Sequence, residues 1–126
     1  VDIQFYREGA VYVWGDEFKV EEVITNFLTN AMNHAEGEKR ITIRFSMHDH
    51  LVRTSVFNTG KPIPEEDLDK IWEKFYKVDK ARTREYGGSG IGLSIVKAIM
   101  DSFEQKCGVI NHEDGVEFWM ELDSNN

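Results

Sequence analysis

Three asparagines stand near one another in this sequence at spacings that suit a shared task. Asn26, Asn30 and Asn33 follow at four- and three-residue intervals, so a helix would place them on one face. An amide oxygen can complete the oxygen shell of Mg²⁺, and an amide NH₂ can donate to phosphate or ribose. Asparagine is a weaker helix former than Glu, Lys or Gln, which favours a polar ligand here. A plain polar helix face, with His34 as a cap near its end, is the alternative.

A glycine-rich segment lies further along the chain. Four glycines occur within six residues, at Gly87, Gly88, Gly90 and Gly92. Backbone N–H groups of such a loop, with the N-terminus of a following helix, can hold phosphate oxygens. The segment lacks the Gly-Lys-Ser/Thr of a Walker A loop, and no βαβ unit surrounds it. A simple connector is the alternative interpretation.

Two shorter motifs lie between these segments. Asn58 and Thr59 follow an apolar alternation and precede Gly60. A short polar side chain there could meet the exocyclic amine of adenine at the floor of a pocket, although the same residues also form ordinary turns. Residues 72–77 are rich in aromatic side chains, for which a hydrophobic plug at the root of the next loop is the simpler interpretation.

Composition and charge limit the class of protein. The 126 residues are 40% hydrophobic and 30% charged, which indicates one soluble globular domain with a core. Cys107 is the only cysteine, so no disulfide forms within the chain and a reducing cytosol is the simplest setting. No signal peptide is visible, and no apolar run approaches the roughly 18 residues of a membrane span. The net charge of −8 argues against nucleic acid as a partner.

Basic residues nevertheless cluster in one part of this acidic chain. Residues 70–84 hold six Lys and Arg against two acidic residues, a local charge of +4. That patch suits a compact anionic ligand, and a solvated basic surface is the alternative. His48 and His50 stand two apart in a predicted turn, and no Cys/His cluster has zinc spacing.

Hydrophobic periodicity predicts the elements that position these motifs. Strands are predicted over residues 11–14, 41–46, 52–56, 109–110 and 116–122, with the last two joined by a turn at Asp114-Gly115. Helices are predicted from an N-cap at Asp16 to about residue 36, over 65–72, and from Ile91 to Phe103. We predict an α+β fold: a two-layer α/β sandwich with about three helices on one face of a mixed, mostly antiparallel sheet. The other sheet face should be partly wet.

In this order and spacing, the four motifs resemble the catalytic ATP-binding domain of sensor histidine kinases, within the wider group of gyrase, Hsp90 and MutL. The resemblance runs from about Tyr12 to Leu122. Its N, G1, F and G2 boxes are similar to residues 26–34, 58–63, 72–76 and 88–93. It implies the α/β sandwich called the Bergerat fold, with ATP bound between the helix layer and a lid at 78–89. We expect residues 80–88 to be disordered without nucleotide.

The resemblance also implies roles for single residues. Asn30 would be the Mg²⁺ ligand, Asn26 would contact the phosphates or the metal, and Lys77 would reach the terminal phosphate. Asn26 and Lys77 are therefore the catalytic candidates. The implied nucleotide-binding residues are Asn26, Asn30, Asn33, His34, Asn58, Gly60, Ile63, Lys77, Gly88, Gly90, Ile91, Gly92 and Leu93.

Three positions refine what the resemblance implies. The G1 box usually begins with Asp, which accepts a hydrogen bond from the adenine amine; the amide oxygen of Asn58 can still accept it. Asn33 stands where the N box often has a basic residue, so one phosphate contact is missing. ATPases of the wider group have a glutamate at the position of Asn26. Because Asn cannot act as a general base, slow hydrolysis is expected and a kinase is favoured.

We therefore expect residues 1–126 to be a single catalytic domain that binds ATP and Mg²⁺, without the dimerisation and phosphoacceptor domain. The γ-phosphoryl would pass to a histidine on that separate domain of the parent protein and then to a response regulator. The domain would be cytoplasmic, without direct membrane contact, while the parent is anchored in the bacterial membrane. By itself the domain should bind ATP and transfer little. A related serine kinase or ATPase, and a degenerate sensor of adenine nucleotide, are the alternatives.

Overall fold

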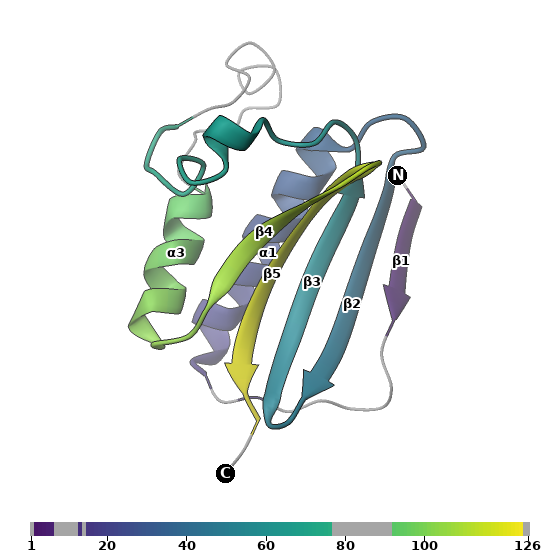
Figure 1. Cartoon of the computed structure of the whole chain (residues 1–126). Coiled ribbons are helices and arrows are strands. Elements are labelled where there is room, and N and C mark those ends of the chain that lie inside the picture. Colours follow the sequence, from purple (N-terminus) through teal and green to yellow (C-terminus); the bar gives the residue numbers. More distant parts are fainter. Residues whose placement is uncertain (1, 7–12, 14, 77–91, 125–126) are drawn as a thin grey trace.

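One five-stranded sheet forms the framework of the protein, and helices cover one of its faces (Figure 1). The computed structural model describes residues 2–6, 13, 15–76 and 92–124. The strands are β1 (Asp2–Tyr6), β2 (Arg40–His48), β3 (Leu51–Thr59), β4 (Cys107–His112) and β5 (Gly115–Asp123). Their order is β1-β2-β3-β5-β4, and only β1 and β2 pair in parallel. The predicted mixed, mostly antiparallel sheet is confirmed.

The two α-helices of the described residues are α1 (Glu17–His34) and α3 (Gly92–Ser102), where about three helices were predicted. The predicted cap begins α1, since Asp16 accepts hydrogen bonds from the backbone N–H groups of Phe18 and Lys19 at 2.9 and 3.1 Å. None of the described helices is both long and apolar enough to cross a membrane.

The core lies between the helices and the sheet. The inward stripe of α1 buries Val23, Phe27 and Ala31, as its spacing predicts, and α3 buries Val96, Ile99 and Met100. From β5, alternate residues from Val116 to Leu122 are buried against these helices. The rings of Phe27 and Phe118 lie 5.7 Å apart and join the two layers.

One predicted element is wrong, and another falls almost entirely outside the described residues. Val13 belongs to no strand, and the remainder of the strand predicted at 11–14 lies outside the described residues. The helix predicted over 65–72 is a single 3₁₀ turn, Glu65–Asp67, followed by further turns. Most hydrogen bonds in this segment, such as Lys70 N–H to the carbonyl of Asp67, span three residues; the bond from Ile71 N–H to the same carbonyl spans four. Successive tight turns still bury Ile71. Helices and such turns therefore leave a similar apolar spacing in the sequence.

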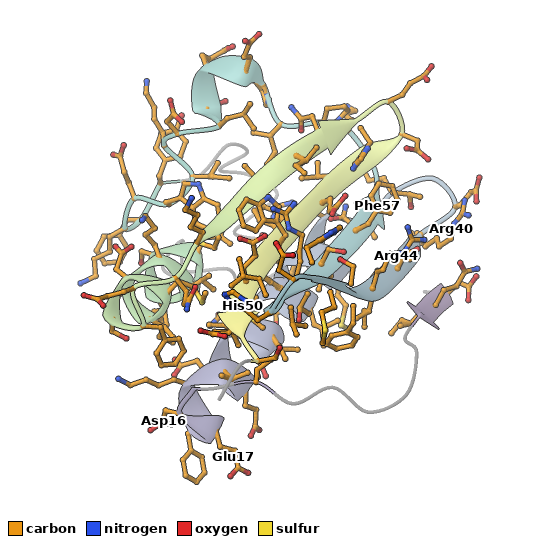
Figure 2. All side chains as sticks on the ribbon, turned by 60° about the horizontal axis from the view of Figure 1, so that its bottom comes forward. Asp16, Glu17, Arg40, Arg44, His50 and Phe57 are labelled. Carbon is orange, nitrogen blue, oxygen red and sulfur yellow. The ribbon has the colours of Figure 1, made fainter. Side chains whose placement is uncertain are left out.

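The sheet face away from the helices carries polar and charged side chains. Figure 2 shows Arg44 and Phe57, which come from the adjacent strands β2 and β3. Arg53 makes two hydrogen bonds to one carboxylate oxygen of Glu121, at 2.9 and 3.0 Å, and lies 3.9 Å over the Trp119 ring. The face thus suits contact with water, as predicted.

Candidate functional site

Thr59 fixes the end of α1 against the end of β3. Its hydroxyl donates to the carbonyl of Glu36 at 2.8 Å and accepts from the backbone N–H of Arg40 at 2.9 Å. Its own carbonyl accepts from Glu36 N–H at 2.8 Å. Asn58 and Thr59 are the last residues of β3, rather than loop residues as predicted, because both pair with β5. The N-box helix and the G1 motif are therefore held in one fixed relation.

Asn58 brings a buried, partly unsatisfied amide to this junction. Its side chain is 3% exposed, and its Nδ2 donates to the carbonyl of Thr59 at 3.1 Å. Within the described residues, its Oδ1 accepts no hydrogen bond. A buried acceptor without a partner costs about 1–3 kcal/mol, so this position suits a ligand that donates one. An exocyclic amine of a purine is such a donor.

Gly60 lies against the C-terminal end of α1. Its φ is +151°, and a Cβ there would stand 2.9 Å from the carbonyl oxygen of His34. Any side chain would therefore be both strained and crowded. Its N–H donates to the carbonyl of Asp114 at 3.0 Å. The predicted site residues His34, Asn58 and Gly60 thus meet at one end of the sheet.

The start of α3 packs directly against the asparagine face of α1. A Cβ at Gly92 would lie 2.9 Å from the Oδ1 of Asn26, so glycine permits this approach. The Nδ2 of Asn26 donates to the carbonyl of Glu22 at 2.9 Å, one turn earlier. A helix N-terminus offers unpaired N–H groups that suit phosphate oxygens. The asparagine face of α1 and the start of α3 are thereby brought together, with Leu93 packed on the core.

Asn30 and Asn33 are partly exposed on the same helix as Asn26. Neither side chain hydrogen-bonds to another residue in the described part of the chain. Their amides therefore face no internal competition for a metal ion or phosphate from those residues. The predicted Lys77, Gly88, Gly90 and Ile91, the lid at 78–89 and the disorder at 80–88 all fall outside the described residues.

Ile63, the last predicted residue of the G1 motif, is held by a residue that the sequence did not single out. The backbone N–H of Ile63 donates to the Oδ1 of Asn111 at 3.0 Å, and the Nδ2 of Asn111 donates to the carbonyl of Ile63 at 2.8 Å. Asn111 occupies the helix-side position of β4, in the row that contains buried Val116. The sequence signal that could have identified Asn111 is that it is polar, while the other helix-side residues of β4 are apolar.

The aromatic F-box segment combines packing with local strain. The rings of Trp72 and Phe118 meet edge-on at 5.9 Å, which supports the interpretation of a plug. Phe75 has a φ of +67° and is 66% exposed. Tyr76 donates a hydrogen bond from its hydroxyl to the Asp67 carboxylate. This bond raises the pKa of Tyr76 because it stabilises the protonated phenol.

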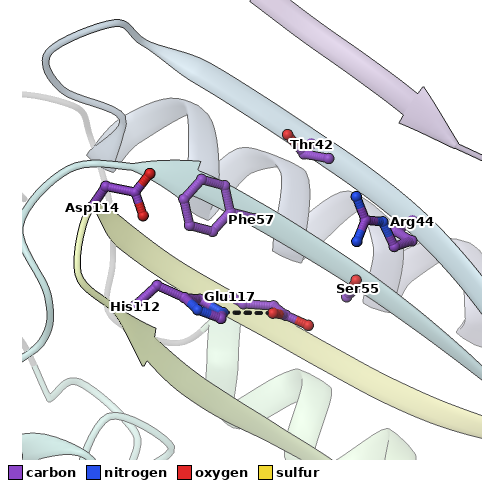
Figure 3. A pocket seen from close by; sticks show the side chains of 7 residues that line it. All are labelled: Thr42, Arg44, Ser55, Phe57, His112, Asp114 and Glu117. Carbon is purple, nitrogen blue, oxygen red and sulfur yellow. Dashed lines mark hydrogen bonds and ion pairs between the residues drawn. The ribbon is translucent and has the colours of Figure 1, made fainter.

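A separate pocket lies on the outer sheet face (Figure 3). Its lining comes from β2, β3, β5 and the β4–β5 hairpin, and includes an ion pair between His112 Nε2 and Glu117 Oε1 at 2.8 Å. No predicted site residue lines it. The outer pocket is therefore distinct from the candidate site, which lies on the helix side.

Comparison with known proteins places these features in context. The family described as histidine kinase-, DNA gyrase B- and HSP90-like ATPase matches residues 15–126. Sensor histidine kinase CusS of Escherichia coli O157:H7 is 36% identical over 118 residues, which cover 94% of this chain and 24% of CusS. Sensor histidine kinase WalK of Bacillus subtilis (strain 168) is 36% identical over 105 residues, which cover 79% of this chain and 17% of WalK.

Solved structures agree with this match. The catalytic domain of histidine kinase ThkA, in a nucleotide-free form, has a TM-score of 0.84 and 31% identity over 98% of this chain and 78% of that domain. ThkA in complex with response regulator protein TrrA gives a TM-score of 0.80 and 31% identity over 98% of this chain and 34% of that one. The chain thus spans a quarter or less of the curated relatives that it matches.

Proposed function

Because the chain belongs to the family of histidine kinase-, DNA gyrase B- and HSP90-like ATPases, we propose that it supplies the γ-phosphoryl of ATP to a histidine elsewhere in its parent protein. Its relatives are sensor histidine kinases, and the chain is a catalytic ATP-binding domain of that type. Residues 1–126 would form one catalytic domain, and the phosphoaccepting histidine would lie on a separate dimerisation domain.

The amide oxygen of Asn58, which accepts no hydrogen bond from the described residues, carries this proposal. It is buried on the helix side of the sheet, beside Gly60 and the end of α1. The adenine amine would donate to this oxygen, and Ile63 would contact the base. Asn58 replaces the carboxylate usual in the family without losing the acceptor. A neutral amide also avoids burying a charge next to the base.

The phosphates and the metal would bind at the other end of the site. The side-chain oxygen of Asn30 would coordinate Mg²⁺, whose remaining ligands would be phosphate oxygens and water. Asn26 and the N-terminus of α3 would contact phosphate oxygens, and the glycines at 88, 90 and 92 would allow close backbone approach. Lys77 would neutralise charge on the terminal phosphate. Bound Mg²⁺ would supply charge neutralisation during the transfer.

The chemistry of the site favours transfer over hydrolysis. Asn26 has no basic group that could take a proton from water, so hydrolysis of bound ATP would be slow. The contribution of this domain would be to position ATP in line with the incoming imidazole nitrogen. That nitrogen would bond to the γ-phosphorus as the bond to the ADP oxygen breaks. The isolated domain would therefore bind ATP and transfer little.

We also propose the partners that such transfer requires. The dimerisation domain would present the histidine, and a response regulator would receive the phosphoryl group from it. A response regulator is named in the ThkA complex, which supports this assignment. The domain would work on the cytoplasmic side, where ATP is available, while the parent is anchored in the membrane. If a supplied dimerisation domain stays unphosphorylated, the chain would instead act as a serine kinase or ATPase, or as a nucleotide sensor without transfer.

Isothermal titration of this chain with ATP tests the proposal, with and without Mg²⁺. We expect micromolar-to-millimolar binding that weakens about tenfold without Mg²⁺ or in Asn30→Ala, because one metal ligand is lost. Thr29→Ala is the matched control, since Thr29 is an exposed neighbour on α1. Absence of ATP binding by the folded wild-type chain would refute the proposed function. If Asn30→Ala binds ATP with Mg²⁺ as tightly as wild type does, Asn30 is not the metal ligand.

A further inference from the structure

The side chain of Asn111 replaces a missing strand partner for the G1 loop. β4 is an edge strand of the sheet, and Ile63 passes beside it without forming a strand of its own. Both backbone groups of Ile63 are bonded to one amide, N–H to Oδ1 at 3.0 Å and C=O to Nδ2 at 2.8 Å. An amide side chain carries the same donor and acceptor as a peptide group, so it holds Ile63 at two points.

This contact lies in the same row of the sheet as Asn58. Val116 of β5 pairs with Asn58 on one side and with Asn111 on the other. Adjacent strands are about 4.8 Å apart, so the backbones of the two asparagines lie about 10 Å from each other. Val116 is buried between them and forms the floor of the row. Asn58 thus offers an acceptor that no described residue uses, while Asn111 fixes the loop at Ile63 on the same row of the sheet.

The wider contacts of Ile63 show why its position matters. Ile63 is half-buried and packs on the hydrophobic core. Three residues earlier, Gly60 is anchored by its N–H to the carbonyl of Asp114. The loop is therefore fixed at both ends, first to the β4–β5 hairpin and then to β4 itself. Loss of the second anchor would release Ile63 while leaving Gly60 in place.

We propose that Asn111 is a positioning residue that sets base selectivity by fixing Ile63 against the purine, an inference that rests on the proposed nucleotide site. It acts through the backbone of Ile63. With both anchors in place, the apolar side chain of Ile63 and the Oδ1 of Asn58 keep a fixed separation. Adenine carries its exocyclic amine at C6 and can donate it to that oxygen, whereas guanine in the same orientation presents its C6 carbonyl oxygen. A loose Ile63 would let guanine shift and turn its C2 amine to the Oδ1 of Asn58, so the preference for adenine would fall.

Titration of ATP and GTP, each with Mg²⁺, into wild type and three variants tests this role. Asn111→Leu keeps a similar shape and removes both hydrogen bonds, and Asn111→Asp retains only the acceptor for Ile63 N–H. We expect Asn111→Leu to weaken ATP binding about tenfold and to reduce the ATP-to-GTP affinity ratio at least threefold, with Asn111→Asp intermediate. His112→Leu, at the next position on the opposite face, should bind both nucleotides as wild type does.

The outcomes separate this inference from the proposed function and from a purely structural role. A lower melting temperature with an unchanged affinity ratio would show that Asn111 only stabilises the fold, and would overturn the inference. Equal affinity of the wild-type chain for ATP and GTP would overturn it as well. Failure of the folded wild type to bind ATP would refute the proposed function itself. If Asn111→Leu does not fold, the affinity ratio of Asn111→Asp decides.

Discussion

Replacing Asn58 with leucine should raise stability and lower affinity for ATP at the same time. Asn58 is 3% exposed, and leucine has a similar length without polar atoms. The substitution removes the Oδ1 that accepts no hydrogen bond from the described residues, together with the Nδ2 that donates to Thr59. The carbonyl of Thr59 is not left unpaired, because it also accepts from Glu36 N–H at 2.8 Å.

The expected change in stability follows from these contacts. Loss of the Nδ2 hydrogen bond costs about 1 kcal/mol, and relief of the unpaired buried oxygen returns about 1–3 kcal/mol. The free energy of unfolding should therefore rise by about 1 kcal/mol in the absence of nucleotide. For a domain of this size, that corresponds to an increase of about 4 °C in Tm.

The expected change in binding has the opposite sign. The adenine amine would lose its acceptor and be buried without a partner, which costs about 2 kcal/mol. That corresponds to an approximately thirtyfold weaker Kd for ATP. The comparison variant is Thr54→Val, which removes a buried hydroxyl from the same face of β3 and should leave ATP affinity unchanged.

Thermal unfolding without nucleotide and isothermal titration with ATP and Mg²⁺ measure the two effects separately. Binding of ATP by Asn58→Leu as tight as that of wild type would contradict the proposed contact with the base. A loss of more than about 1 kcal/mol of stability would show instead that the amide acts mainly in the fold.

Three further predictions follow from individual positions. In Gly92→Ala the new Cβ must displace the Asn26 side chain, so ATP affinity measured by titration should fall about tenfold. Stability should change by less than about 1 kcal/mol, and a Kd equal to that of wild type would contradict this. Phe75 has a φ of +67°, so in urea unfolding Phe75→Gly should be about 1 kcal/mol more stable than Phe75→Ala, and equal stability would show that the segment relaxes. Burial raises the pKa of the Cys107 thiol, so less thiolate forms at pH 8. Iodoacetamide should therefore react with the folded chain more slowly than with the urea-unfolded chain, and its rate should rise at higher pH. Equal rates for the two at pH 8 would argue against this shift.

Periodic segments were predicted well because their signal is local. The stripe from Val20 to Ala31 and the alternation from Val116 to Leu122 both face the core as predicted. In α1 the fully buried residues are Val23, Phe27 and Ala31, with the rest of the stripe partly buried. The sheet class followed from the order of such segments. β1 was missed, since an edge strand with a single parallel neighbour need not show a strong alternation of its own.

Residues whose roles depend on distant partners were harder to predict. The motifs identified the N, G1 and G2 boxes, and the structure brings Asn26 to Gly92 and His34 to Gly60. Asn111 carries no such motif, because its role depends on Ile63, which lies 48 positions away. Likewise, the turns that replace the predicted helix at 65–72 satisfy the same apolar spacing, with mostly three-residue hydrogen bonds in place of helical ones.

The described part of the candidate site presents neutral amides and backbone to its ligand, in a chain with a net charge of −8. A carboxylate at position 58 would be buried and desolvated, and it would add repulsion toward an anionic nucleotide. Asn58 retains the acceptor and avoids that charge, at the cost of an oxygen that no described residue donates to. In the proposed site, attraction for the phosphates would come from Mg²⁺, from helix and backbone dipoles and from the basic residues between positions 70 and 84. The amide pocket would select the base, and the metal would supply most of the attraction for the phosphates.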